Sequence, residues 1–85
     1  MFELRVLSGL HLGAALPLFG DAWLIGQADD ADLMLSDDGI ASHACRLRRE
    51  DETWWLEPAT GEPLPVECDT PFAVGNIWLC VANSE

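Results

Sequence analysis

The chain has 85 residues, of which 49% are hydrophobic, and its formal net charge is −11 at pH 7 because 15 carboxylates face four arginines and no lysine. A chain of this length can build one domain around one modest core, which excludes a second lobe. Its charge repels phosphate backbones and anionic lipid headgroups, so we expect no nucleic acid and no direct membrane insertion. A basic protein is the natural complement; the alternative is that the charge serves solubility alone.

The first half of the chain is predicted to consist of short strands joined by turns. Residues 2–6 alternate between apolar and charged side chains, which is typical of a half-buried strand. Pro17 indicates an edge strand or a bulge. Residues 36–39, Ser-Asp-Asp-Gly, form a strong turn signal. We expect strands over residues 2–6, 14–18, 22–25 and 33–35.

The second half continues this pattern. Apolar and polar residues alternate over residues 44–48, and the acidic run 50–52 is typical of a hairpin tip. Residues 58–65 hold three of the five prolines and are predicted to form a loop, after which a short strand begins at Val66. Further strands are expected over residues 53–57, 72–74 and 77–82.

The pattern as a whole predicts an all-β protein. No stretch shows the apolar stripe of a helix, and turn signals recur about every 8–12 residues, the spacing of a sandwich. We therefore expect one β-sandwich domain over residues 1–82, built of about 9–11 short, mostly antiparallel strands. Residues 83–85 are interpreted as a polar tail that begins a linker.

The cysteines indicate a reducing compartment. Cys45, Cys68 and Cys80 are an odd number without CxxC spacing, which argues against a disulfide framework. Cys45 and Cys80 lie in strand-like runs and are expected in the core. An acid at Glu3 and the lack of a long apolar run predict no signal peptide and no transmembrane segment.

Candidate catalytic and metal-binding residues form no recognisable site. Ser42 and His43 are adjacent, so on a strand they point to opposite faces, which disfavours a nucleophile–base pair. His43 and Cys45 share a face, but the histidines and cysteines lack the spacing of a zinc site. The acidic runs 29–32 and 37–38 lack the pattern of an EF-hand loop and are interpreted as turns. We predict no enzyme, no cofactor and no metal.

Arginines and tryptophans are candidates for binding a protein partner. Arg46 and Arg48 share one strand face and would suit a carboxylate or phosphate, although cross-strand pairing with glutamates is the simpler interpretation. The adjacent tryptophans at 54–55 point to opposite faces, so one is core and the other is a candidate anchor, with Trp23 and Trp78 as alternatives. The candidate docking residues are Trp55, Arg46, Arg48, Asp29 and Asp30.

The chain resembles a forkhead-associated (FHA) domain over nearly its full length, and residues 25–47 carry the motifs of this resemblance. FHA domains are β-sandwiches whose loops at one end bind phosphothreonine. Their signature is Gly-Arg after an early strand, then Asp or Asn followed by a hydrophobic residue, then Val-Ser-Arg-x-His-Ala-x-Ile, and later an Asn in a loop. Here residues 26–27 (Gly-Gln), 32–33 (Asp-Leu) and 40–47 (Ile-Ala-Ser-His-Ala-Cys-Arg-Leu) align with these elements. The resemblance implies an FHA-like β-sandwich.

The phosphate-binding positions of the FHA signature are not kept. Gln27 stands for the first arginine, and Ala41 stands for the serine. Ser42 replaces the second arginine and Ala44 the histidine, while His43 is one place early and would point to the other face. Because phosphate recognition needs a guanidinium fork and a hydroxyl donor, the resemblance implies a site that has lost phosphothreonine binding.

A degenerate, acidic FHA pattern is similar to the cytoplasmic N-terminal domain of the type III secretion inner-membrane ring protein (the YscD-like family). The similarity rests on the opening residues 2–14, Ile-Gly at 25–26, Ala-Asp-Leu at 31–33, Asp-Gly-Ile-Ala at 38–41 and Val-Gly-Asn-Ile-Trp-Leu at 74–79.

This second resemblance implies a non-catalytic docking domain at the cytoplasmic face of the bacterial inner membrane, in contact with cytoplasmic sorting-platform proteins of the injectisome. Family members continue into one transmembrane helix and a periplasmic ring-forming region. Residues 83–85 would then lead towards an anchor not present in this chain, and sister ring subunits would meet through parts outside it. The isolated domain is expected to be monomeric because its charge is self-repelling. The alternative is a signalling FHA domain that binds phosphothreonine peptides.

Overall fold

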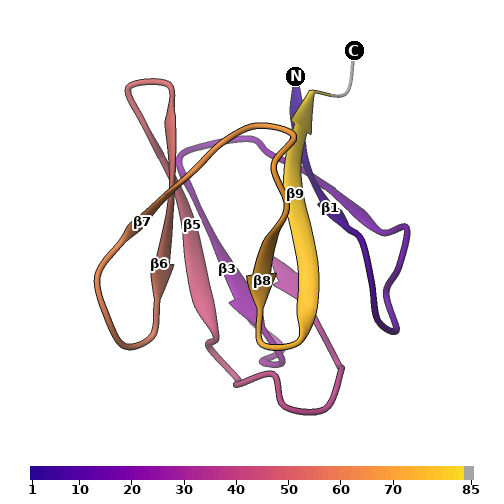
Figure 1. The fold of residues 1–85 in the computed structure, drawn as a ribbon. Helices are drawn as coiled ribbons and strands as arrows, with labels where there is room; N and C mark the ends of the chain where they lie inside the picture. The colour runs from indigo at the N-terminus through magenta and orange to yellow at the C-terminus, as the bar shows by residue number, and fades with distance from the viewer. Residues whose placement is uncertain (84–85) are drawn as a thin grey trace.

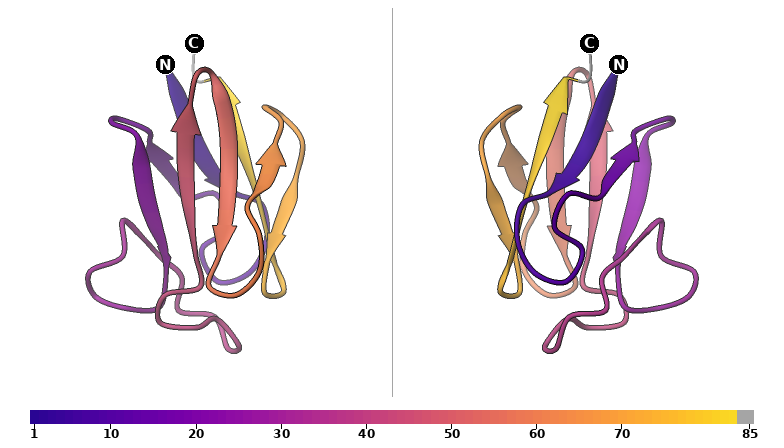
Figure 2. Two further views of the ribbon diagram at one scale, coloured as in Figure 1. Left: turned by 90° about the vertical axis from the view of Figure 1, so that its left-hand side faces the viewer. Right: turned by 90° about the vertical axis from the view of Figure 1, so that its right-hand side faces the viewer.

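The protein is a two-layered β-sandwich, and the computed structural model describes residues 1–83 (Figures 1 and 2). Sheet A has the strand order β2 (Ala15–Pro17), β1 (Phe2–Val6), β9 (Ile77–Asn83), β8 (Phe72–Val74). Sheet B has the order β4 (Leu33–Met34), β3 (Ala22–Gly26), β5 (Cys45–Glu50), β6 (Thr53–Pro58), β7 (Leu64–Val66). The predicted all-β sandwich is therefore confirmed.

Strand pairing is antiparallel throughout except between β3 and β4, which run parallel. Short antiparallel strands follow from the frequent turn residues, because a tight turn can join only antiparallel neighbours. No helix formed by residues 1–83 could span a membrane.

The core lies between the two sheets and is built from the alternating apolar residues of the strands. Trp23 and Trp54 pack with ring centroids 5.8 Å apart, and Phe2 meets Trp54 edge-on at 5.5 Å. The guanidinium of Arg49 lies over both Phe2 and Trp54, at 5.2 and 5.0 Å from their ring centroids. The largest fully buried side chains are Leu4, Val6, Ile25, Leu35, Leu47, Leu79 and Val81.

The predicted side-chain alternation of β6 is confirmed, since Trp54 and Leu56 are buried and Trp55 is only half-buried on the opposite face. The three cysteines are free. Cys45 and Cys80 are buried, as their strand-like context predicted.

The predicted loop over residues 58–65 is partly wrong. Leu64 and Pro65 belong to β7, where Pro65 lies opposite Trp55. β7 is the edge of sheet B, and a proline is tolerated there because its missing N–H can fall on the unpaired side.

Several other strand ends are shifted. The strand expected over residues 14–18 shortens to β2, and the strand expected over 33–35 ends at Met34. β5 runs on to Glu50, so the hairpin tip is reduced to Asp51 and Glu52, whose φ angles are 49° and 69°. Two such left-handed residues suit the right-handed twist of a two-residue hairpin.

β9 also runs one residue further than predicted, and Asn83 pairs with Phe2. Residues 84–85 of the predicted polar tail lie outside the described residues. The last described residues and the N-terminus lie at one end of the sandwich, whereas the loops that follow β3, β4 and β6 lie at the opposite end (Figure 1). We call that second end the loop end.

Candidate functional site

The backbone of the loop end is held by a close approach between two segments. Gln27 and Ala28 donate N–H bonds to the carbonyl oxygens of Ala41 and Ser42, both at 3.0 Å. A Cβ atom on Gly26 would lie 2.1 Å from the Ser42 oxygen, so only glycine fits at this position. Steric exclusion therefore explains why this position, which aligns with the glycine of the FHA signature, is occupied by glycine.

Asp32, which also aligns with the FHA signature, closes the loop between β3 and β4. Its Oδ2 accepts a hydrogen bond from the Leu24 N–H at 2.7 Å, and its own N–H donates to the Leu24 carbonyl at 2.8 Å. The side chain and the main chain of Asp32 thus both bind Leu24 in the middle of β3, so this aspartate has a role in shaping the loop.

The side chain of Gln27 binds within the protein. Its Nε2 donates a hydrogen bond to the backbone carbonyl of Asp37 at 2.8 Å, which links the loop after β3 to the loop after β4. The position that aligns with the phosphate-binding arginine is therefore filled by a neutral amide that braces the loop end.

Asp37 is the one buried charged side chain among the described residues, with 7% of its surface exposed. Its Oδ2 accepts a hydrogen bond from the Leu10 N–H at 2.8 Å, and Oδ1 is buried without a hydrogen-bond partner in the described structure. Close by, the His11 Nε2 accepts a bond from the Ser36 N–H at 3.1 Å. Asp37 does begin the predicted turn, since the Ile40 N–H donates to its carbonyl at 3.3 Å, but its side chain is buried and so has no solubilising role.

The other residues that align with FHA ligand positions are spread along an open edge. Ala41, Ser42 and His43 are exposed, and Ala44 is half-buried. The His43 Nε2 lies 3.2 Å from the Asp30 Oδ1, and both side chains are mostly in solvent. The structure therefore brings together His43 and Asp30, which were predicted separately.

The His43–Cys45 pair does not resemble a metal site. Burial raises the pKa of the Cys45 thiol to about 11, whereas a metal ligand must be a thiolate. No group of three potential metal ligands comes together within residues 1–83.

The charge of the loop end is wholly negative apart from its histidines. Residues 6–45 contain neither arginine nor lysine. The two loops after β3 and β4 carry five aspartates, Asp29, Asp30, Asp32, Asp37 and Asp38. An anion between these two loops would meet carboxylates, and neither loop carries a guanidinium to bind it.

The candidate docking residues lie in three places. Arg48 and Trp55 lie opposite each other on β5 and β6 and line one shallow hollow on the outer face of sheet B. Arg48 pairs with Glu50, and its Nε lies 3.4 Å from the Glu57 Oε2. The contact with Glu57 is the cross-strand pairing that the sequence favoured, whereas Glu50 lies on the same strand as Arg48.

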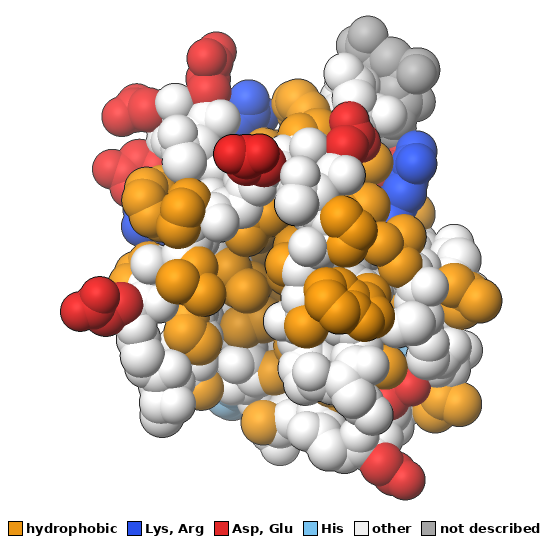
Figure 3. Space-filling model, viewed as in Figure 1, with side chains coloured by type: hydrophobic (Ala, Val, Ile, Leu, Met, Phe, Trp, Pro, Cys, Tyr) orange, Lys and Arg blue, Asp and Glu red, His pale blue; other side chains and the backbone are white. Residues whose placement is uncertain are grey.

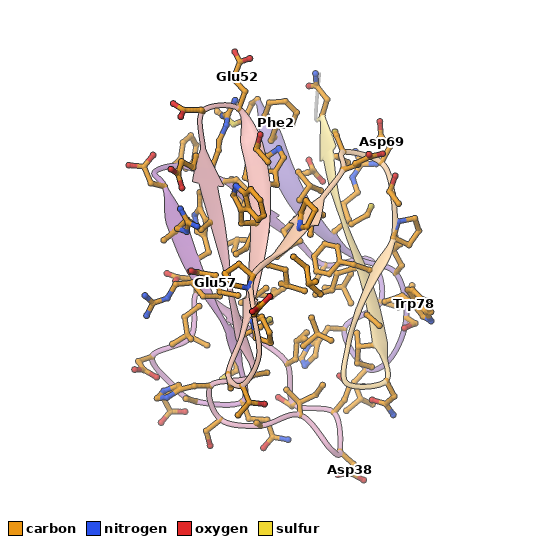
Figure 4. All side chains as sticks on the ribbon, turned by 60° about the vertical axis from the view of Figure 1, so that its left-hand side comes forward. Phe2, Asp38, Glu52, Glu57, Asp69 and Trp78 are labelled. Atoms are coloured by element: carbon orange, nitrogen blue, oxygen red, sulfur yellow. The ribbon has the colours of Figure 1, made fainter. Side chains whose placement is uncertain are left out.

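Arg46 lines a neighbouring hollow together with His43 and Glu57. Asp29 and Asp30 lie in the loop after β3, away from the hollow of Trp55. The other tryptophans separate clearly: Trp23 is buried and donates from its Nε1 to the Phe19 carbonyl at 3.0 Å, whereas the side chain of Trp78 is half exposed (Figure 4).

Comparison with known proteins places these features in a family context. Residues 5–85 match the sequence model of a family described as the inner membrane component of the type III secretion system, cytoplasmic domain. None of the curated protein sequences compared with the chain is significantly similar to it.

Solved structures share the fold. The FHA domain of the CT664 protein from Chlamydia trachomatis is 19% identical, with a TM-score of 0.87 over 99% of this chain and 98% of that chain. The cytoplasmic domain of the sorting platform protein PscD from P. aeruginosa is 21% identical, with a TM-score of 0.83 over 99% and 81%. A Salmonella type III secretion system protein is 18% identical, with a TM-score of 0.75 over 99% and 96%.

Proposed function

The chain belongs to the family of cytoplasmic domains of the type III secretion inner-membrane component, and we propose that it is a non-catalytic docking domain that binds cytoplasmic sorting-platform proteins and does not bind phosphothreonine. The proposal joins a complete FHA-like scaffold to a loop end that lacks the groups an FHA ligand needs. Its partners would be proteins, in keeping with the expectation drawn from the charge.

The observation that carries the proposal is the hydrogen bond from Gln27 to the Asp37 carbonyl. A phosphate group carries about −1.5 to −2 charges at neutral pH and is bound by guanidinium forks or by clustered N–H and O–H donors. Here one of the two amide N–H donors of Gln27 is already used, and the surrounding loops carry five carboxylates. Binding a phosphate at this end would therefore bring like charges together.

The arrangement of the chain ends fits a role beneath a membrane. β9 ends on the side of the sandwich that lies opposite the loop end (Figure 1). If a single membrane anchor follows in the parent protein, the loop end points away from the membrane and both sheet faces are open to cytoplasmic proteins. Sister subunits would meet through other parts, and several copies in a ring would raise the effective concentration of each docking site.

A phosphothreonine-binding domain is the second candidate, and Arg46 is the observation that favours it. Arg46 and His43 line one hollow near the loop end and could offer two donors to an anion. Glu57 lines the same hollow, and His43 lies against Asp30, so the hollow also presents negative charge. We therefore favour the first proposal.

Two measurements test the proposal. Isothermal titration should give equal, weak heats for a phosphothreonine peptide and its unphosphorylated twin; clearly tighter binding of the phosphopeptide, lost in Arg46→Gln, would establish the second candidate instead. Deletion of residues 1–82 in the bacterium should abolish the recovery of sorting-platform proteins with the inner-membrane ring and reduce secretion. Normal recovery and secretion after the deletion would refute docking.

A further inference from the structure

A half-exposed tryptophan stands on the outer face of sheet A. Trp78 is 50% exposed and lines a shallow hollow with Leu7 and Pro71. Its ring is directed away from the sandwich, and Asp69 lies on the same side of the molecule (Figure 4). In the space-filling view, hydrophobic side chains gather over the middle of the face around β8 and β9, with acidic side chains at its margins (Figure 3).

The position of Trp78 is fixed by its backbone. The Trp78 N–H donates to the Ser8 Oγ at 2.9 Å, and the Leu7 N–H donates to the Trp78 carbonyl at 2.8 Å. Its neighbours Ile77 and Leu79 face inward and are buried. The indole of Trp78 therefore adds little to the core and is available for contact with another molecule. Aromatic side chains held in this way are typical anchors of protein interfaces.

The same face carries negative charge one step further along β9. Cys80 lies two residues beyond Trp78 on this face, about 7 Å along the strand. The backbone of Asp69 is held beside this part of β9, because the Asp69 N–H donates a hydrogen bond to the Val81 carbonyl at 2.7 Å. The one cation on this stretch, Arg5, pairs with Glu3 at 2.9 Å between Arg5 Nε and Glu3 Oε2 and also lies near Asp69, so two carboxylates share one guanidinium. The surface therefore combines an apolar hollow with an acidic neighbour.

We infer that this face, formed by Leu7, Pro71, Trp78 and Asp69, docks a basic protein segment that presents one apolar side chain to the hollow and a lysine or arginine to Asp69. The spacing suits two side chains about two residues apart in an extended segment, or one turn apart in a helix. The inference rests on the proposed docking function and adds the face that docks and the chemistry of the partner.

A second copy of this chain is the less suitable occupant. It would bring a net charge of −11 against another −11. Its arginines are also largely engaged, because Arg5 pairs with Glu3, Arg48 pairs with Glu50 and Glu57, and Arg49 stacks on aromatic rings. A basic partner has no such penalty.

Photo-crosslinking in the secreting bacterium tests the inference on the protein as the cell makes it. Benzoylphenylalanine replaces Leu7 on this face or, as the comparison, Thr53 on sheet B. We expect crosslinks from position 7 to a protein segment that has a lysine or arginine within about four residues of the crosslinked apolar residue, one helical turn. The yield should fall about tenfold in Trp78→Ser and about threefold in Asp69→Asn.

Leu64→Ser is the matched control, because Leu64 is equally exposed but lies on β7 of the other sheet, and its yield should stay unchanged. Asp69→Asn keeps the left-handed backbone at this residue, where φ is 65°, and so tests charge without disturbing the fold.

Crosslinks from position 7 only to a second copy or to lipid, or a crosslink yield that is unchanged in Trp78→Ser, would overturn the inference. Crosslinks to a cytoplasmic protein from position 53 alone would refute this face and leave docking intact, and no crosslink from either position would contradict both.

Discussion

The carboxylate of Asp37 accepts a hydrogen bond from the backbone N–H of Leu10, 27 residues earlier, at 2.8 Å. This bond ties the loop between β1 and β2 to the loop between β4 and β5, and so joins the two sheets at the loop end. Gly9 makes room for it, because a Cβ there would lie 2.5 Å from the Asp37 Oδ2. The loop end is thus braced by a buried carboxylate where an FHA ligand site is expected.

Removing this brace should destabilise the fold. Asp37→Ala leaves the Leu10 N–H without its acceptor, and we expect the free energy of unfolding in urea to fall by about 1–3 kcal/mol. Asp38→Ala, at the exposed neighbouring position, is the matched control and should change it by less than about 0.5 kcal/mol. Equal effects of the two substitutions would show that the buried bond contributes nothing.

Gly26→Ala should be more costly than an alanine at an unobstructed glycine. The new methyl group would lie 2.1 Å from the Ser42 oxygen, so the loop must move and we expect a loss of about 1–3 kcal/mol. Gly13 has a φ of 92° but no atom within 4 Å of an added Cβ, so Gly13→Ala measures backbone strain alone. The midpoint temperature of thermal unfolding should be lower for Gly26→Ala than for Gly13→Ala. The opposite order would contradict the steric argument.

Phosphate binding should appear when the donors of the FHA signature are introduced. The triple variant Gln27→Arg, Ala41→Ser, Ser42→Arg places two guanidiniums and a hydroxyl on a scaffold whose glycine and aspartate are in place. We expect titration at low salt to show a phosphothreonine peptide binding about tenfold tighter than its unphosphorylated twin.

The control for this variant carries the same added charge elsewhere. Thr53→Arg with Ala73→Arg places two arginines at exposed positions of the two sheets and should show no preference for the phosphopeptide. A preference in the control would mean that net charge, and not the loop-end geometry, governs binding.

Stability should fall at alkaline pH through Cys45. Burial raises the pKa of its thiol from 9.0 to about 11, so the folded state keeps a proton that the unfolded state releases between these values. The stability that this thiol contributes is fully present below pH 9 and is lost as the pH rises towards 11. The urea midpoint of unfolding should therefore fall between pH 9 and pH 11, and it should fall less steeply with pH in Cys45→Ala. The same dependence on pH in both proteins would assign the fall to other groups.

The fold was predictable from the sequence because its local signals agree with one another. Alternation in residues 2–6 and 77–82, turn residues at regular intervals and the absence of a helical stripe all indicate a sandwich. The opposite faces of Trp54 and Trp55 and the burial of Cys45 follow from the two-residue period of a strand alone. The burial of Cys80 does not, because Cys80 shares its face of β9 with the half-exposed Trp78. The pairing partner of each strand and the strand status of Leu64 and Pro65 did not follow, since Pro65 is acceptable only at an edge.

The departures from the FHA signature at residues 27, 41, 42 and 44 are visible in the sequence, because the residue type at each aligned position can be compared directly with the signature. The hydrogen bonds by which Gln27 and Asp37 hold the loop end together could not be predicted from the sequence. Their partners lie in other loops, and no local pattern connects Leu10 with Asp37. The tertiary structure alone also decided which tryptophan reaches solvent. Trp23, Trp55 and Trp78 all lie in strands, and only the stacking of two sheets determines which strand faces are covered.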